Sequence, residues 1–199
     1  MITFKDATES DMTSVAKLHV DCFQGTFIAS LGLELIENYY CEYLKDKCPF
    51  VLAYEDNSLI GFCMGYYDGS KARKSFLEHN KKQLIRRLLK LCLSFNRLAI
   101  SKCWHYVFPA KKPKKDKAKL PVRAEADLLS VCVKDIYRGL GVSKGLVKEF
   151  ENKLIENKKK DVTLSVYMTN DRAIGFYKKM GYSIVDETVD EYKMYKQLQ

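Results

Sequence analysis

The sequence predicts an α/β protein with a central mixed sheet flanked by helices, and three observations lead to this prediction. About 40 residues in the C-terminal half follow the order strand, glycine turn, helix and strand, which is a βαβ unit with parallel strands. The N-terminal part follows the order βααββ. Apolar residues make up 47% of the 199 residues and aromatic residues 12%, which excludes intrinsic disorder and supplies a core.

The first elements are a short strand and a helix. Residues 2–5 are a strand candidate. Thr8 and Asp11 then have the spacing of a capping box, with Asp in place of the usual Glu. The apolar residues that follow recur at roughly helical spacing and predict a helix; they are Val15, Leu18, Val20 and Cys22.

A second helix and a hairpin come next. After a polar break, apolar residues at helical spacing predict a helix over 33–44. Two runs rich in strand-forming residues, 50–54 and 59–67, are joined by the polar residues 55–58, which is a hairpin signal.

A strongly basic segment follows. Residues 71–119 hold 16 Lys and Arg but only two acids, Glu78 and Asp116, a net charge of +14, whereas the other 150 residues sum to −5. Ser75 and Glu78 have capping-box spacing, and apolar residues recur behind them, which predicts a long basic amphipathic helix. Residues 111–119 predict a lysine-rich loop broken by proline.

We interpret 71–120 as a basic helical insertion with a long loop inside one domain that spans 1–199. Three interpretations of its charge are open. The helix could cover the domain with its apolar side while its basic side chains face water. It could instead bind an anionic membrane surface. The lysines of the loop could also contact nucleic acid or the ribosome through phosphates.

The C-terminal half contains the βαβ unit and a closing hairpin. Residues 127–133 predict a strand, 141–158 a helix and 162–168 a second strand. A further helix over 171–180 ends at Gly181, a natural C′ glycine. The closing hairpin is predicted from the runs 182–185 and 192–196.

Several classes of protein are excluded. No apolar run reaches the ~20 residues that a membrane span needs, and the N-terminus has no secretory signal pattern. The seven cysteines form no Cys-x-x-Cys pair, and the three histidines are scattered, so no disulfide frame and no metal site is expected. These features predict a soluble cytoplasmic protein.

A glycine-containing turn is the first candidate binding feature. Gly139 and Gly141 lie between a predicted strand and a helix N-terminus, where backbone N–H groups and the helix dipole favour an anion. Glycine also lets a phosphate approach the backbone closely. The turn lacks the lysine of a nucleoside-triphosphate loop and does not follow the first strand as a dinucleotide motif would.

A second motif sharpens this interpretation. Together with the turn, residues 170–182 resemble the signatures of the GNAT N-acetyltransferase superfamily. The first signature, Arg/Gln-x-x-Gly-x-Gly/Ala, matches at Arg138 and Gly141 but has Ser143 at its last position. The second, Asn-x-x-Ala-x-x-Phe-Tyr-x-x-x-Gly-Phe, matches at Asn170, Ala173, Phe176, Tyr177 and Gly181, with Tyr182 replacing Phe.

The resemblance implies a GNAT fold in which acetyl-CoA, the cosubstrate, lies between splayed parallel strands four and five. The pantetheine arm would pair with the backbone of Val131 and Val133. The pyrophosphate would bind the amides of Arg138, Gly139, Leu140, Gly141, Val142 and Ser143. Among the motif residues, those implied to contact the cofactor are Asn170, Ala173 and Phe176.

The family's chemistry also implies catalytic roles. A neutral amine must attack the thioester, so a carboxylate has to remove the proton of an ammonium group whose pKa is about 10.4. By register with similar proteins Asp127 is the candidate base, because it lies four residues before Val131 and is expected on the same strand face; Glu125 is the reserve. Tyr177 is the candidate acid for the thiolate. The alternatives are that Tyr177 is a packed aromatic and Asp127 a solvated or paired carboxylate. Cys132 is expected to face the opposite side as a core thiol.

The sequence therefore predicts an acetyl-CoA-dependent N-acetyltransferase that works by direct attack, without a covalent intermediate or a metal. The resemblance implies that the last hairpin borders the acceptor site, so the acidic turn 186–191 implies a cationic amine acceptor, although exposed acidic turns are also common. The acceptor's identity and the oligomeric state stay open. The alternative is a GNAT-like binding module whose basic segment docks on an anionic membrane or on nucleic acid.

Overall fold

The computed structural model describes residues 1–93 and 123–199, and a seven-stranded mixed sheet lies at its centre. Its strands are β1 (Ile2–Asp6), β2 (Phe50–Glu55), β3 (Ser58–Tyr67), β4 (Ala126–Val133), β5 (Asp161–Tyr167), β6 (Ser183–Glu187) and β7 (Glu191–Gln197). Their order in the sheet is β1-β2-β3-β4-β5-β7-β6. Only β4 and β5 pair in parallel, and the other neighbours are antiparallel.

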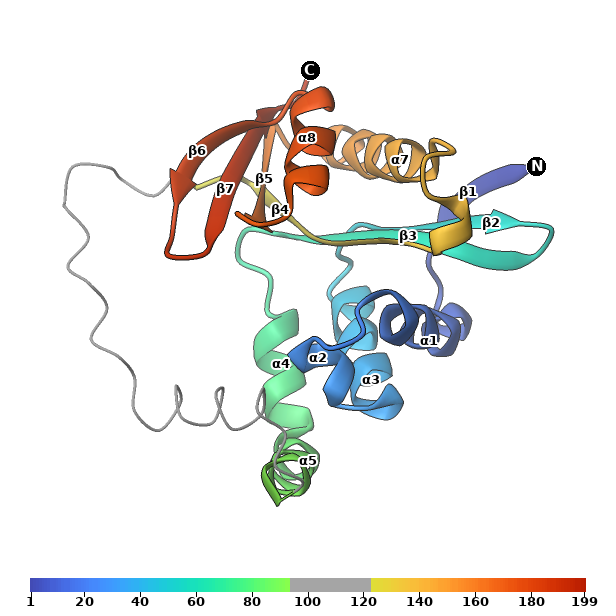
Figure 1. The fold of residues 1–199 in the computed structure, drawn as a ribbon, viewed down its shortest axis with the longest axis vertical. Helices are drawn as coiled ribbons and strands as arrows, with labels where there is room; N and C mark the ends of the chain where they lie inside the picture. Colours follow the sequence, from blue (N-terminus) through green and yellow to red (C-terminus); the bar gives the residue numbers. More distant parts are fainter. Residues whose placement is uncertain (94–122) are drawn as a thin grey trace.

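Helices cover both faces of the sheet (Figure 1). One face carries α7 (Val142–Glu156) and α8 (Asp171–Lys179). The other carries α1 (Met12–Cys22), α2 (Phe27–Ser30), α3 (Leu33–Lys45) and α4 (Ala72–His79), while α5 (Lys81–Leu93) lies farthest from the sheet. Short 3-10 turns, Glu9–Asp11 and Asp135–Tyr137, precede α1 and α7. A separate core fills each face, so the sheet is buried on both sides, as the α/β prediction requires.

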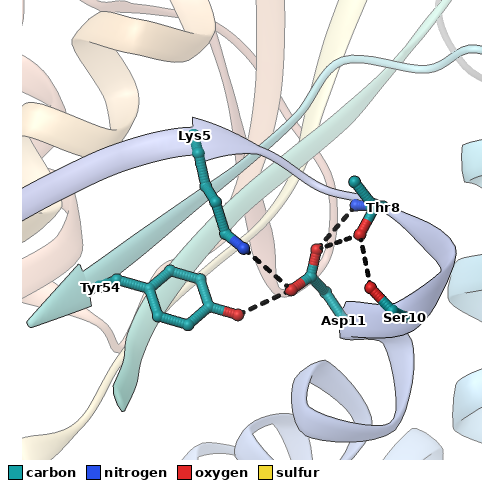
Figure 2. A network of polar contacts seen from close by, with 5 residues as sticks. All are labelled: Lys5, Thr8, Ser10, Asp11 and Tyr54. Atoms are coloured by element: carbon teal, nitrogen blue, oxygen red, sulfur yellow. Dashed lines mark hydrogen bonds and ion pairs between the residues drawn. The ribbon is translucent and has the colours of Figure 1, made fainter. Parts of the chain in front are cut away.

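The predicted capping box at the start of α1 is confirmed, and it is part of a larger network (Figure 2). The backbone N–H and the hydroxyl of Thr8 donate to one oxygen of Asp11, at 2.9 and 2.6 Å. The other oxygen accepts from the Tyr54 hydroxyl at 2.8 Å and from Lys5 Nζ at 3.2 Å. Burial alone would raise the pKa of Asp11, but these hydrogen bonds outweigh it and lower the pKa to about 2.

The second predicted capping box, at Ser75, is wrong because α4 begins three residues earlier. The carboxylate of Asp46 accepts hydrogen bonds from the backbone N–H groups of Lys71 and Ala72 at 2.9 and 3.3 Å. The unpaired N–H groups at the start of α4 are thus capped by a residue that is distant in the sequence. The prediction of one long helix is wrong as well, because the chain forms two helices that are separated at Asn80, where the backbone is not helical. The side chain of Asn80 accepts a hydrogen bond from Asn38 on α3.

The part of the predicted helix beyond Leu93 and the predicted lysine loop over 111–119 lie outside the described residues. Within those residues no helix is both long enough and apolar enough to cross a membrane.

The end of α8 is confirmed as a glycine-dependent C-cap. Gly181 has φ +92°, a conformation that favours glycine. Its N–H donates to the carbonyl of Lys178, and the N–H of Tyr182 donates to the carbonyl of Tyr177, both at 3.0 Å. This is the Schellman pattern, and it turns the chain sharply from α8 into β6.

Candidate active site

The parallel strands β4 and β5 separate from one another, and this opening organises the site. Their paired residues are only Asp127 with Thr163 and Leu128 with Leu164. The rest of β4 is paired with β3 alone. The sheet therefore has an opening at the carboxyl ends of its two parallel strands, the place where open α/β sheets bind ligands.

A β-bulge in β4 accompanies the separation. Met64 pairs with Ser130 and Gly65 with Leu128, so Leu129 is the extra residue. The bulge brings the carbonyl oxygen of Asp127 so close to β3 that a Cβ on Gly65 would lie 2.3 Å from it. Only glycine fits opposite the bulge.

The bulge overturns one expectation from the sequence. Val131 and Val133 pack against the core under α7 and α8, whereas Cys132 is buried in the core under α1 and α3. Asp127 lies near Tyr66 on the α1 and α3 side. The prediction that Asp127 and Val131 share a strand face is therefore wrong, because the extra residue between them reverses the alternation of side chains. The prediction that Cys132 is a core thiol on the face opposite Val131 is confirmed, and burial raises its pKa well above the ordinary range.

Asp127 is a partly buried carboxylate at the start of the opening. Its Oδ2 accepts a hydrogen bond from Thr163 Oγ1 at 2.9 Å. Burial raises its pKa, while the Thr163 hydrogen bond and the charge of Lys193 on β7 oppose the rise without cancelling it. These two partners could not be predicted from local pattern, because the pairing of Thr163 with Asp127 and the placement of β7 beside β5 depend on the strand order.

Glu125, the reserve base, has a structural contact. One of its carboxylate oxygens accepts the backbone N–H of Lys160 at 2.7 Å, immediately before β5. Its own N–H donates to the carboxylate of Asp161 at 2.8 Å. These two bonds hold the starts of β4 and β5 together, on the side away from the opening.

The predicted glycine turn leads from β4 into α7. Gly139 and Gly141 have φ +86° and +84°, and a Cβ on either would meet no protein atom within 4 Å, so the space beside the turn is open. Among the hydrogen bonds of the described residues, none uses the N–H groups of Gly141, Val142 and Ser143. These are the unpaired donors of a helix N-terminus, where the dipole favours an anion. The Arg138 guanidinium is paired with Asp135 at 2.6 Å.

The second motif forms α8. Asn170 is the N-cap, and its side-chain oxygen accepts the N–H of Ala173 at 3.1 Å. Ala173 and Phe176 are partly buried against the core that α7 and α8 share. Asn170 thus has a structural role that alone explains its place in the motif.

Tyr177 points into the same core and is only 9% exposed. Burial, and secondarily the neighbouring Cys63, raise the pKa of its hydroxyl. Cys63 is the cross-strand partner of Val131. Tyr177 therefore lies near the part of β4 that no longer pairs with β5. It is on the same face of the sheet as Val131 and on the face opposite Asp127.

Comparison with known proteins decides the family. The model of the Acetyltransferase (GNAT) family matches residues 12–182, which is most of the chain. The chain belongs to the GNAT acetyltransferase family. No curated protein sequence matches it.

Solved GNAT structures share the fold at low sequence identity. Ard1 from Thermoplasma volcanium matches with a TM-score of 0.61 and 18% identity, covering 100% of this chain and 98% of that one. The PaiA N-acetyltransferase from Thermoplasma acidophilum, solved in complex with coenzyme A, matches with 0.60 and 16%, covering 99% of each chain. The ribosomal-protein-S18-alanine N-acetyltransferase from Escherichia coli matches with 0.61 and 10%, covering 100% and 95%. At these identities the likeness establishes the shared fold.

Family membership makes acetyl-CoA the cosubstrate and an amine the acceptor of the acetyl group. Two observations indicate that the structure can accommodate acetyl-CoA. β4 and β5 pair over two residues only, which leaves the β4 backbone beyond Leu128 without a partner on β5. The glycine turn offers unpaired N–H groups beside open space, which suits a pyrophosphate.

Proposed function

We propose that this GNAT enzyme transfers the acetyl group directly from acetyl-CoA to an amine, with Asp127 as the base and Tyr177 as the acid. The observation that carries the proposal is the opening between β4 and β5, which has a carboxylate at its start on one face and a buried tyrosine on the other.

The donor would lie along the α7 side of the opening. Val131 and Val133 lie in the part of β4 that pairs with β3 but not with β5, so the β5 side of this strand can pair with the amides of the pantetheine arm. The N–H groups of Gly139, Gly141, Val142 and Ser143 would hold the pyrophosphate. The N–H groups of Arg138 and Leu140, which the sequence also predicted for this role, already donate to the carbonyls of Asp135 and Tyr137. Asn170, Ala173 and Phe176 would form the α8 wall. The Asn170 cap fixes the start of that helix, and through it the position of Tyr177.

Asp127 would remove the proton from the acceptor's ammonium group, directly or through water. Its raised pKa makes it a stronger base than an exposed aspartate. Its position on the α1 and α3 face means that the amine approaches from the side opposite the α7 wall. The hydrogen bond from Thr163 orients the carboxylate. Glu125 is the weaker candidate, because its carboxylate already accepts the Lys160 N–H.

Tyr177 would donate a proton to the departing thiolate. Burial raises its pKa, so the hydroxyl stays protonated at any physiological pH. The hydroxyl accepts and donates no hydrogen bond within the described part of the chain, which leaves its proton available for a ligand. A protonated donor of this kind assists a thiolate leaving group, whose ordinary pKa is about 8.5.

The acceptor would be a cationic amine. Four acidic residues surround the turn between β6 and β7: Asp186 and Glu187 end β6, Asp190 lies in the turn, and Glu191 begins β7. The carbonyl of Asp190 accepts the N–H of Met168 at 2.9 Å, which fixes this acidic turn beside the carboxyl end of β5, at the rim of the opening. Its field would attract a positively charged acceptor and disfavour an anionic one.

Release of the CoA thiol over a panel of amines tests this proposal. A polyamine, a peptide with a free N-terminus, an amino sugar and a neutral hydrophobic amine would be compared at matched concentration. We expect acceptor-dependent thiol release that is fastest for multiply charged amines and falls with ionic strength. Equal rates for all amines would contradict the cationic acceptor, and no release with any amine would contradict acetyl transfer to amines.

A further inference from the structure

Helix α5 has two sides with different surroundings. Its inner side contacts the protein: Leu84 packs against the small core between α2, α3 and α4, and the Arg87 guanidinium donates to the carbonyl of Ser30 at 2.9 and 3.0 Å. Residues three and four apart continue this inner side to Leu91, which is buried. The helix is therefore held against the body, and its outer side has a fixed direction.

The outer side of α5 combines apolar and basic side chains. Ile85, Leu89 and Leu93 lie four residues apart and are 48%, 59% and 79% exposed. The basic residues beside them are all exposed; they are Lys81, Lys82, Arg86 and Lys90. The helix contains no acidic residue. Within residues 1–93 and 123–199, these three aliphatic side chains form one exposed apolar row on a basic helix, which is typical of a contact surface.

The charge and the apolar row together define the partner. A helix with exposed leucines set among lysines and arginines binds the interface of an anionic bilayer: the aliphatic chains enter the acyl boundary, and the basic groups reach the headgroup phosphates. Nucleic acid would use the charges but would leave the aliphatic row in water. We propose that the outer side of α5 docks this enzyme on an anionic phospholipid surface.

Two further features of the structure support this orientation. Beside α5 an open groove runs to the start of α3, and it is lined by Gly32, Leu33, Glu34, Arg86, Arg87 and Lys90. Leu33, on the α3 side of this groove, is 47% exposed and is a further apolar side chain near the basic residues of α5. Figure 1 shows α5 farther from the sheet than α1, α3 and α4, so docking through α5 does not require the sheet itself to touch the membrane.

Co-sedimentation of the full chain with vesicles tests the proposal. The vesicles would be pure phosphatidylcholine or phosphatidylcholine mixed with phosphatidylserine. One variant carries Ile85→Ser, Leu89→Ser and Leu93→Ser, and the other carries Lys82→Gln, Arg86→Gln and Lys90→Gln. The control carries Ile155→Ser and Lys148→Gln on the exposed side of α7.

We expect wild type and control to bind the anionic vesicles and not the zwitterionic ones. The serine variant should bind at least about 10-fold more weakly. The glutamine variant should bind on the order of 100-fold more weakly. Unchanged acetyl-CoA-dependent thiol release and circular dichroism would show that each variant is folded.

Three results would overturn the proposal. One is failure of the folded wild-type chain to bind anionic vesicles. Another is wild-type affinity in the serine variant, which would leave only a nonspecific charge effect. The third is binding of single-stranded RNA, unaffected by the serine substitutions, in place of vesicle binding. None of these results depends on the proposed acceptor, so they are separable from failure of the catalytic proposal.

Discussion

Asp127 and Val131 lie on opposite faces of the sheet although they are four positions apart in the sequence, because Leu129 between them is the extra residue of a β-bulge in β4. This relationship places a carboxylate and the strand segment proposed for the donor on two sides of one opening. It also gives the amine its own approach, away from the donor. The proposed mechanism depends on this separation.

The first prediction concerns Asp127 and stability. Because burial raises its folded-state pKa above the unfolded value, the ionised carboxylate destabilises the fold, and stability falls as pH rises through the folded pKa. The melting temperature of Asp127→Asn should therefore increase relative to that of wild type as pH rises from acidic to neutral. The same variant should lose turnover. Melting curves over a pH series would show this. A constant difference at all pH values would show that the carboxylate is not destabilised by burial.

Tyr177→Phe should lower kcat by roughly 10- to 100-fold, since a general acid is lost, and should leave acetyl-CoA affinity nearly unchanged. The ring keeps its packing beside Phe176 and Tyr182, so the fold should persist. Calorimetry gives the affinity and thiol release gives kcat. An unchanged kcat would leave Tyr177 as a packed aromatic.

The glycine turn gives a matched pair of substitutions. Gly141 and Gly69 have φ +84° and +85°, and a Cβ on either meets nothing within 4 Å. Alanine at either position should cost about 1 kcal/mol of stability through the backbone alone. Only Gly141→Ala should also weaken acetyl-CoA binding, measured by calorimetry, because only that turn is proposed to hold the pyrophosphate. Equal binding in the two variants would remove the turn from the cofactor site.

Asp11 provides a prediction about acid stability. Its pKa is lowered from 3.8 to about 2, so its contribution is present above pH 4 and is lost as pH falls through the folded pKa. Asp11→Asn should cost about 2 kcal/mol at neutral pH and progressively less toward pH 2. Urea unfolding at several pH values would measure it. Asp21→Asn is the control, because Asp21 is exposed near the end of α1.

The strands and helices of the family core could be predicted from the sequence because each has a local signal. Gly181 ends α8 and the run at 127–133 forms β4, as their residues indicate. The bulge at Leu129 could not be predicted, because it is defined by pairing with β3, distant in sequence. The break at Asn80 and the cap from Asp46 also depend on tertiary contacts. The position of the site could therefore be predicted from the motif residues. The face of the sheet on which Asp127 lies could be determined only from the pairing of the strands.

Direct acetyl transfer with Asp127 as base and Tyr177 as acid is tested most directly by acceptor-dependent thiol release from acetyl-CoA, measured for wild type and for the double variant Asp127→Asn with Tyr177→Phe. We expect steady release by wild type with its best amine. The double variant should lose nearly all of this release while binding acetyl-CoA normally by calorimetry. Release at the wild-type rate by the double variant would show that these two side chains do not carry out the proton transfers.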